Sequence, residues 1–344
     1  MFGHPEFDDH EQVVFASHRE SGLRCIIAIH STALGPAFGG CRMRPYTSEA
    51  EALADALHLS RGMTFKAGIC ELPYGGGKAV VIGDPRKDKS RPLLRALGRA
   101  VEALGGRYIV AEDVGTTLAD LAVLREVTTY TAAATGASQQ PLAVTAYGVL
   151  MALRAAAGLV FGSTGLSGRV IAVQGLGNVG FPLCGYLHRE GAMLIVSDVD
   201  PRRSARAARA FGARPTPPEA ILDEAADIFA PCALGGVLDR QTIQRLKVRI
   251  VCGGANNQLA EPGLDVDLAE RGILYVPDYL ANAGGVIDFH QERVDDRPEA
   301  VLRAVDRIHD IVGDVLARAG SERCTPLQIA DRLVRQRVNA MRCP

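Results

Sequence analysis

The stretch Arg169-Val-Ile-Ala-Val-Gln-Gly-Leu-Gly-Asn-Val-Gly180 decides how the second half of the chain folds. Its first part is apolar without polar alternation, which is typical of a central strand in a parallel sheet. The glycine-rich turn Gly175-Leu-Gly177-Asn178-Val179-Gly180 follows and opens a predicted helix. The next predicted strand, 193–196, leads to Asp198 about 20 residues later, which completes the context of a dinucleotide-binding turn. A glycine-rich turn without a ligand is the alternative, and this context disfavours it.

Each glycine of the turn has its own physical purpose in such a site. Gly175 permits the tight turn, Gly177 lets a pyrophosphate approach the backbone, and Gly180 lets helix and strand pack closely. The helix N-terminus offers amides and partial positive charge to the phosphates. Asp198 is expected to bind the adenosine ribose hydroxyls and to repel a 2′-phosphate, which favours NAD over NADP. The nearby pair Arg202-Arg203 makes that exclusion less strict.

Strands and helices alternate along the rest of the chain. We predict strands at 23–30, 78–82, 108–111, 228–230, 250–252 and 273–276, and helices at 47–59, 93–104, 145–157, 298–319 and 326–341. This order predicts an α/β protein of two domains with a cleft between them.

The first predicted domain covers residues 1–140 and is rejoined by the C-terminal helix 321–344. It is expected to be an α/β domain for substrate binding and oligomerisation. The second, residues 141–320, is expected to be a doubly wound Rossmann domain that binds NAD. The segment Gly22–His30 is a candidate edge strand for pairing across a two-fold axis.

Composition excludes several functional classes. The 344 residues carry a net charge of −1 without a basic stripe, which disfavours a nucleic-acid partner. No apolar run is expected to reach the roughly 20 residues that a membrane-spanning helix needs. The eight cysteines form no C-x-x-C pair and no histidine cluster has metal-ligand spacing, so neither a metal site nor a disulfide framework is expected. We predict a cytoplasmic protein whose partner is a small molecule.

A second motif, Gly75-Gly-Gly-Lys78, places a lysine where a glycine-rich turn meets an apolar strand. It is not a phosphate-binding P-loop, because that pattern requires glycine at the position of Leu72 and serine or threonine at that of Ala79. Burial disfavours the ammonium form of such a lysine. Lys66 lies twelve residues earlier among similar neighbours. Two solvated surface lysines are the alternative, which the apolar and glycine neighbours disfavour.

A third motif, Ala111-Glu112-Asp113-Val114-Gly115, stands at the carboxyl end of a predicted strand. Parallel α/β sheets bind their ligands at this edge. One of the two carboxylates is expected to be catalytic, although either could be a helix cap. The residues themselves do not choose between Glu112 and Asp113.

Taken together, these motifs resemble the Glu/Leu/Phe/Val dehydrogenase family, and within it the short leucine, phenylalanine and valine dehydrogenase branch. The resemblance extends over nearly the whole chain. The motifs that occur in matching order are Gly35-Pro-Ala-Phe-Gly-Gly-Cys-Arg-Met43, Lys66, Gly75 to Lys78, Ala111 to Thr117, Gly175 to Gly180, Gly254-Ala-Asn-Asn-Gln258 and Pro277-Asp-Tyr-Leu-Ala-Asn-Ala-Gly-Gly285.

The resemblance implies reversible, NAD-dependent oxidation of an L-amino acid to a 2-oxo acid and ammonia. It assigns to Asp113 the shuttling of protons to and from the amino group, and to Lys78 the activation of the water that attacks the imine. A carboxylate base is required because the amine must be neutral before hydride leaves Cα. The nicotinamide carries the hydride.

The resemblance also implies the binding residues. Lys66 is expected to pair with the substrate carboxylate, helped by the amides of Gly39 and Gly40 and by Asn257. The cofactor residues it adds to Asp198 and the glycine turn are Thr145, Asn256 and Asn282.

The positions that line the side-chain pocket in this family are Phe38, Ala111, Val286 and Phe289. All four are apolar here, so the second carboxylate of glutamate would be buried without a partner. The two phenylalanines either narrow the pocket toward valine, or stack with an aromatic substrate. The sequence does not decide between these.

The loop Cys70–Tyr74 departs from the family pattern, in which it is smaller and more apolar. Glu71 and Tyr74 either reach the substrate or face solvent.

Alternative functions are a glutamate dehydrogenase and a catalytically silent dinucleotide sensor. The presence of Lys66, Lys78 and Asp113 together disfavours the sensor. A hydroxy-acid dehydrogenase would need a histidine base beside an arginine clamp, which the eight histidines do not suggest. The resemblance implies a homo-oligomer, either a dimer or an octamer.

Overall fold

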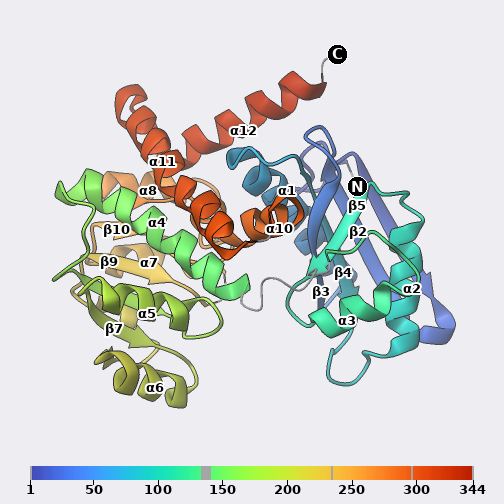
Figure 1. The fold of residues 1–344 in the computed structure, drawn as a ribbon, viewed down its shortest axis with the longest axis horizontal. Helices are drawn as coiled ribbons and strands as arrows, with labels where there is room; N and C mark the ends of the chain where they lie inside the picture. The colour runs from blue at the N-terminus through green and yellow to red at the C-terminus, as the bar shows by residue number, and fades with distance from the viewer. Residues whose placement is uncertain (1, 133–140, 234, 296, 343–344) are drawn as a thin grey trace. The chain divides into compact units, whose positions relative to one another are not determined.

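The computed structural model describes residues 2–132, 141–233, 235–295 and 297–342, and the chain divides into two compact units (Figure 1). The first unit comprises Met1–Gly136 and Val334–Pro344, and the second comprises Ala137–Leu333. From the sequence, the first domain was expected to be rejoined by the C-terminal helix from residue 321 onward. The structure keeps 321–333 with the second unit, where Thr325 donates a hydrogen bond to Asp265.

The first unit is built on a five-stranded mixed sheet in the order β1-β2-β4-β3-β5. The strands are β1 (Gln12–His18), β2 (Leu23–Ser31), β3 (Ala37–Arg44), β4 (Gly75–Ile82) and β5 (Tyr108–Glu112). β3 is parallel to β4 and β5, and β2 is antiparallel to β1 and β4. The prediction of an edge strand at 22–30 was wrong, because β1 covers that side of β2 and forms the edge itself.

Helices cover both faces of this sheet. α1 (Glu49–Ile69) begins at Ser48, whose hydroxyl accepts a hydrogen bond from the Glu51 amide. It packs Ala52, Ala56 and Leu57 against β2 and β4. The other face is covered by α2 (Arg91–Glu102) and α3 (Leu118–Leu124). The predicted helix 47–59 ended ten residues too early, and the full length of α1 includes Lys66.

The second unit holds a six-stranded sheet in the order β11-β10-β9-β6-β7-β8, and every pairing in it is parallel (Figure 1). Its strands are β6 (Val170–Gln174), β7 (Met193–Ser197), β8 (Arg214–Pro215), β9 (Ile228–Pro231), β10 (Ile250–Val251) and β11 (Leu274–Tyr275). Counted from β6, this is the 3-2-1-4-5-6 order of a doubly wound dinucleotide-binding sheet, as predicted. The order reverses between β6 and β9, and such sheets bind ligands at the carboxyl ends of these strands.

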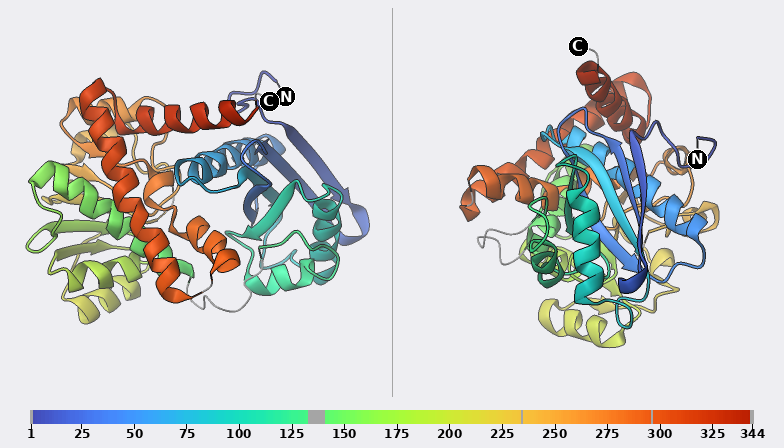
Figure 2. Two further views of the ribbon diagram at one scale, coloured as in Figure 1. Left: turned by 45° about the horizontal axis from the view of Figure 1, so that its top comes forward. Right: turned by 90° about the vertical axis from the view of Figure 1, so that its right-hand side faces the viewer.

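The helices of the second unit pack around this sheet (Figure 2). They are α4 (Pro141–Phe161), α5 (Gly180–Arg189), α6 (Pro201–Phe211), α7 (Arg240–Arg245), α8 (Leu264–Glu270), α9 (Asp278–Ala281), α10 (Gly284–Val294) and α11 (Pro298–Glu322). The last helix, α12 (Pro326–Arg342), begins in the second unit, and its residues from Val334 onward belong to the first. α7 and α8 bury their apolar side chains against β9, β10 and β11. α4 packs against α5, α10 and α11.

One helix corrects the expectation about apolar runs. Within α4, Ala143–Phe161 is long and apolar enough to cross a membrane, with a mean hydropathy of 1.7. More than half of it, 56 %, is buried inside the fold, where α5, α10 and α11 contact it. Its apolar character is therefore accounted for by its place in the core of the second unit.

The close packing of α1 on β4 requires glycine at position 76. A Cβ at Gly76 would lie 2.1 Å from the Thr64 backbone nitrogen and 2.3 Å from the Ser60 carbonyl oxygen. Gly76→Ala is therefore expected to lower the free energy of unfolding by about 2–3 kcal/mol, because the backbone of α1 must move. Urea denaturation of the purified protein measures this.

Gly62 provides the matched control, because it lies within α1 and a Cβ there would meet nothing within 4 Å. Gly62→Ala is expected to raise stability by up to about 1 kcal/mol, since alanine is the better helix former. Equal effects of the two substitutions would contradict the packing argument.

Candidate active site

A buried ion pair links the middle of β4 to the end of β5. The Nζ atom of Lys78 lies 2.5 Å from Oδ2 of Asp113. Lys78 is only 6 % exposed although it carries a charged group. The motifs Gly75–Lys78 and Ala111–Gly115, which are far apart in sequence, therefore meet in the first unit. They meet because β3 is the only strand between β4 and β5.

Asp113 has further positive and hydrogen-bonding neighbours. Nε of Arg42 donates to Oδ2 of Asp113 over 3.0 Å, and the other end of the guanidinium pairs with Asp55. The hydroxyl of Tyr46 donates to Asp55 over 2.6 Å. Burial alone would raise the pKa of Asp113, but the charges of Lys78 and Arg42 and the hydrogen bonds outweigh it and hold that pKa well below its ordinary value. The carboxyl group is thus ionised at neutral pH.

The structure distinguishes the two carboxylates that the sequence left open. Thr117 is the N-cap of α3 and forms a capping box with Asp120, and the backbone N–H of Leu118, the first residue of that helix, donates to the Glu112 carboxylate. Asp113 pairs with Lys78. Glu112 is half-buried, and burial raises the pKa of its carboxyl group.

The glycines of β3 allow close approach of the neighbouring backbones. A Cβ at Gly39 would lie 1.8 Å from the Gly77 carbonyl oxygen, and one at Gly40 would lie 2.7 Å from Cβ of Asp113. β3 pairs with β4 at Ala37–Phe38 and again at Cys41–Arg44. Gly39 and Gly40 stand between these two paired stretches, beside the Lys78–Asp113 pair.

The other predicted residues of the first unit lie on α1, β3 and β5. Lys66 is half-buried near the end of α1. Phe38 is buried on β3, and its ring centroid lies 5.8 Å from that of Tyr74. Ala111 is the register partner of Gly40 on β5.

In the second unit, the three glycines of the dinucleotide turn have different surroundings. Gly175 has a φ of +89°, a region that glycine adopts without strain, and a Cβ there would meet Ala233 at 2.8 Å. A Cβ at Gly180 would lie 1.9 Å from the Gly175 carbonyl oxygen, so helix and turn are in close contact. A Cβ at Gly177 would meet only Nη1 of Arg203, at 3.9 Å. Protein packing thus requires the first and third glycines but not the second.

The other residues of the turn follow the predicted arrangement. Asn178 is exposed, and Val179 stands at the N-cap of α5. The carboxylate of Asp198 accepts hydrogen bonds from the amides of Leu176 over 2.7 Å and Asp200 over 2.9 Å. Nη1 of Arg203 lies 3.6 Å from the same carboxylate. Asp198 is therefore held against the turn, with an arginine beside it.

Unsatisfied polar atoms mark the carboxyl ends of two central strands and the end of α9. Oε1 of Gln174 at the end of β6, Oγ of Ser197 at the end of β7 and Oδ1 of Asn282 after α9 are buried and have no hydrogen-bond partner among the residues that the structure describes. Sequence analysis missed Gln174 and Ser197; a polar residue closing an otherwise apolar strand is the signal that identifies them. A bound polar ligand would satisfy such atoms.

The second unit also contains four further predicted site residues: Asn256, Asn257, Asn282 and Thr145. The side-chain amide of Asn282 donates to Oδ1 of Asn256 over 2.9 Å. Asn257 has a φ of +54°. Thr145, on α4, faces the start of α10, where a Cβ on Gly285 would be 3.1 Å from the Thr145 hydroxyl.

The pocket residues Val286 and Phe289 are both buried on α10, and the Arg293 guanidinium stacks 3.8 Å from the Phe289 ring centroid. Phe38 and Ala111 belong to the first unit. The structure of each unit thus places two of the four residues predicted to line the pocket.

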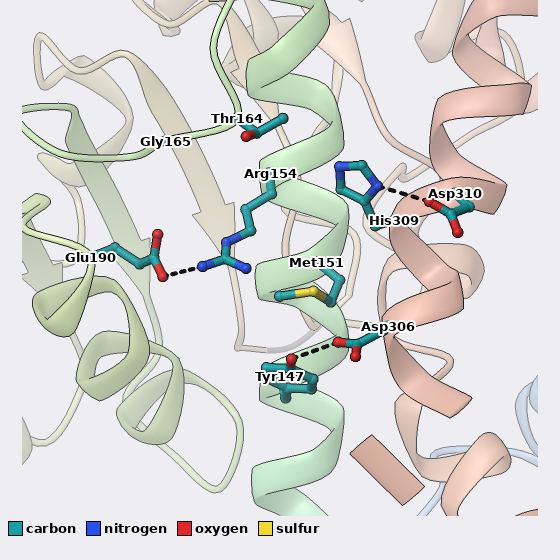
Figure 3. Close-up of a pocket in the computed structure, with 9 residues that line it drawn as sticks. All are labelled: Tyr147, Met151, Arg154, Thr164, Gly165, Glu190, Asp306, His309 and Asp310. Carbon is teal, nitrogen blue, oxygen red and sulfur yellow. Dashed lines mark hydrogen bonds and ion pairs between the residues drawn. The ribbon is translucent and has the colours of Figure 1, made fainter. Parts of the chain in front are cut away.

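Another pocket, of about 590 Å³, opens on the second unit between α4 and α11 (Figure 3). Its polar side chains satisfy one another: Tyr147 donates to Asp306 over 2.6 Å, Arg154 pairs with Glu190, and His309 bonds Asp310. None of the predicted site residues lines it. The remaining lining residues are Met151, Thr164 and Gly165.

Comparison with known proteins identifies relatives of both units. Residues 10–130 match the family model of the Glu/Leu/Phe/Val dehydrogenase dimerisation domain, and residues 201–303 match that of Glutamate/Leucine/Phenylalanine/Valine dehydrogenase. Leucine dehydrogenase of Geobacillus stearothermophilus is 48 % identical over 99 % of this chain and 94 % of its own length. Valine dehydrogenase of Streptomyces virginiae is 45 % identical over 98 % of this chain and 96 % of its own length.

Solved structures with a similar fold include another amino-acid dehydrogenase. The crystal structure of L-tryptophan dehydrogenase from Nostoc punctiforme matches with a TM-score of 0.82 and 41 % identity, covering 97 % of each chain. These similarities extend over both units and confirm the resemblance drawn from the motifs. The chain therefore belongs to the Glu/Leu/Phe/Val dehydrogenase family, whose members named here are oxidoreductases that act on amino acids.

Proposed function

We propose that this chain is an NAD-dependent dehydrogenase that converts an apolar L-amino acid and water into the 2-oxo acid and ammonia, and that the reaction is reversible. The observation that carries the proposal is the buried Lys78–Asp113 pair, which links the middle of β4 to the end of β5. The relatives named above act on leucine, valine and tryptophan, which supports an amino-acid substrate.

Asp113 and Lys78 perform the proton chemistry in this proposal. A carboxylate that stays ionised at neutral pH accepts the proton that the substrate ammonium must lose before hydride can leave Cα. The lysine beside it polarises the water that attacks the resulting imine. Because Lys78 is buried, few water molecules surround it, and its charge acts at short range on Asp113 and on the substrate.

The substrate carboxylate binds beside this pair. Lys66, half-buried on α1, supplies the opposite charge. The amides of Gly39 and Gly40, between the two paired stretches of β3, donate hydrogen bonds. Asn257 of the second unit completes the set. Backbone amides suit this purpose because they bring donors close without the bulk of a side chain.

The apolar residues Phe38, Ala111, Val286 and Phe289 surround the substrate side chain in this proposal. Three of them are buried, and none offers a charge to a second carboxylate. Glutamate would therefore lose hydration without gaining a partner. This argues against a glutamate dehydrogenase and in favour of leucine, valine or an aromatic amino acid.

The second unit fits NAD at the carboxyl ends of β6 and β7. The open space over Gly177 admits a pyrophosphate to the backbone. NAD supplies hydrogen-bond partners to the buried oxygens of Gln174, Ser197 and Asn282, which have none among the described residues. Asp198 binds the ribose hydroxyls. When bound, the nicotinamide takes up the hydride from Cα.

The cofactor set is completed by Asn178, Val179, Thr145 and Asn256. The amides of the first two face the phosphates at the start of α5, where the helix dipole favours negative charge. Asn256 is held by Asn282 in an orientation suited to the nicotinamide end.

We also propose that the protein is a homo-oligomer. β1 is an edge strand of the first unit, and its Phe15 side chain is 62 % exposed. A second copy of the chain would cover this edge and its aromatic side chain.

The catalytic pair is tested by turnover. Wild-type protein with NAD and L-leucine, L-valine, L-phenylalanine, L-tryptophan or L-glutamate is expected to reduce NAD with an apolar substrate and not with glutamate, measured by nicotinamide absorbance. Lys78→Ala and Asp113→Asn are each expected to lower kcat by about 10³-fold or more, because proton transfer loses its donor or acceptor.

Lys87 supplies the control for that experiment, because its side chain is 80 % exposed and its Nζ lies 3.8 Å from the Asp84 carboxylate, away from the Lys78–Asp113 pair. Lys87→Ala is expected to keep kcat within about threefold of wild type, since surface ion pairs contribute little. Absence of turnover with every amino acid, while NAD still binds, would instead support the dinucleotide sensor.

Gly177→Ala separates cofactor binding from protein stability. The added methyl meets no close protein atom, so thermal stability is expected to stay unchanged. It occupies the path of the pyrophosphate, so the Kd for NAD is expected to rise about tenfold or more in calorimetric titration. Gly185→Ala, on the same helix α5 with only ordinary contacts to Phe211, should leave both quantities unchanged. Equal Kd values for the two variants would show that the phosphates lie elsewhere.

The depressed pKa of Asp113 predicts a pH dependence of stability. The folded-state pKa lies below the unfolded value of about 3.9, so the ionised carboxylate stabilises the fold above about pH 4 and loses this effect as the pH falls further. Asp113→Asn is therefore expected to be about 3 kcal/mol less stable than wild type at pH 7, and this gap should narrow below pH 4. Urea denaturation at a series of pH values measures it.

The exposed Asp310 provides the comparison, since Asp310→Asn removes a carboxylate that is 82 % exposed. Its effect is expected to stay within about 0.5 kcal/mol at every pH. A constant gap for Asp113→Asn across the pH series would mean that the carboxylate contributes no charge-dependent stability.

A further inference from the structure

The loop between α1 and β4, residues 70–74, packs against a predicted pocket residue. Leu72 and Tyr74 of this loop are both buried. The Tyr74 ring lies 5.8 Å from the Phe38 ring, centroid to centroid, at an interplanar angle of 44°. Tyr74 therefore limits the orientations that Phe38 can adopt, because two buried rings in contact cannot turn independently.

The same loop also touches the segment that leads into Phe38. A Cβ at Gly35 would lie 2.2 Å from the carbonyl oxygen of Pro73, and the Gly35 φ of +137° is one that side chains rarely allow. The Gly75 amide donates to the carbonyl oxygen of Gly35 over 3.1 Å. A displacement of the loop thus moves both the ring of Phe38 and the backbone before it.

The C-terminal end of α12 holds this loop. Nη1 of Arg337 donates to the Gly68 carbonyl oxygen over 3.0 Å, and its Nη2 lies 3.0 Å from the Glu71 carboxylate. Val334 contacts Gly68, where a Cβ would come within 2.8 Å of it. Figure 2 shows the end of α12 close to the N-terminal segment, and Arg335 correspondingly pairs with Asp8.

The backbone conformation of Glu71 is unfavourable and must be fixed by neighbouring residues. Its φ of +59° is left-handed, which is unfavourable for a residue other than glycine. A strained residue keeps its conformation only when its surroundings fix it. Two interactions fix the conformation of Glu71. Its carboxylate pairs with Arg337, and its backbone N–H donates a hydrogen bond to the Gly68 carbonyl oxygen over 3.2 Å.

We propose that Tyr74 is a positioning residue for Phe38 and that Arg337, through Glu71, fixes the loop that carries Tyr74, so that the C-terminal helix sets which side chains the substrate pocket accepts. This inference rests on the proposed function, in which Phe38 lines that pocket. It assigns a role in amino-acid selection to residues that need not touch the substrate.

Substrate ratios test the role of Tyr74. With Tyr74→Ala, Phe38 gains room to turn away, so kcat/KM for L-phenylalanine divided by kcat/KM for L-valine is expected to rise about tenfold, the range that pocket size controls. Tyr74→Phe keeps the ring and should keep the wild-type ratio. Equal ratios in wild type, Tyr74→Ala and Tyr74→Phe would overturn the proposal.

The role of Arg337 needs a control on the same helix. Arg337→Gln and Glu71→Gln each remove the ion pair, and each is expected to shift the ratio in the same direction by about threefold or more, whereas Arg337→Lys restores most of it. Arg335→Ala removes the pair with Asp8 and leaves the loop untouched, so it should lower kcat/KM for both substrates equally, if at all. Glu71 is 52 % exposed, so Glu71→Gln keeps the test valid if Arg337→Gln fails to fold.

The outcomes are distinguishable from failure of the proposed function. If wild-type protein oxidises neither valine nor phenylalanine nor any other amino acid, the proposed function fails first. If it oxidises them but Arg337→Gln, Glu71→Gln and Arg335→Ala all change the two kcat/KM values in parallel, then α12 contributes only stability and the inference is wrong.

Discussion

The buried contact between Lys78 and Asp113 is the constraint on which the first unit depends. Two charged groups at this depth cost several kcal/mol of hydration each, so they persist only with close pairing and additional hydrogen bonds. Arg42 and Asp55 supply these and carry the network from β3 to α1. The glycines of β3 and β4 allow the close packing around this pair, because a side chain at these positions would collide with the neighbouring strand or with α1.

The glycines of the two units illustrate how packing and binding differ as causes. At Gly39, Gly76 and Gly180 an added methyl would collide with backbone, so the fold alone explains them. At Gly177 it would collide with nothing near, and the fold gives no reason for glycine there. A residue that the protein does not need for its own packing is one that an approaching ligand can explain, which strengthens the reading of the turn as a phosphate site.

Much of this arrangement was predictable because it follows from local pattern. The strand, glycine turn and acidic residue around Gly175 and Asp198 predicted the doubly wound sheet, whose strand order the structure confirms. Local pattern failed where long-range pairing decides. The segment 37–44 is a strand although it is rich in glycine, because β4 and β5 pair with it on both sides. The preference for Asp113 over Glu112 depends on Lys78 and Arg42, which no spacing along the chain brings together.

Substrate selection is the property that local pattern predicts least well, and the structure gives a physical reason. The four residues predicted to line the pocket are all apolar, but in the proposed site the room for a substrate depends on the orientation of the Phe38 ring. That ring contacts Tyr74, and the loop carrying Tyr74 is held from α12 by a residue more than 260 positions away along the chain from Gly68, its hydrogen-bond partner. The proposal therefore makes selection depend on residues that no local pattern identifies, because a packed interior transmits small displacements rather than absorbing them.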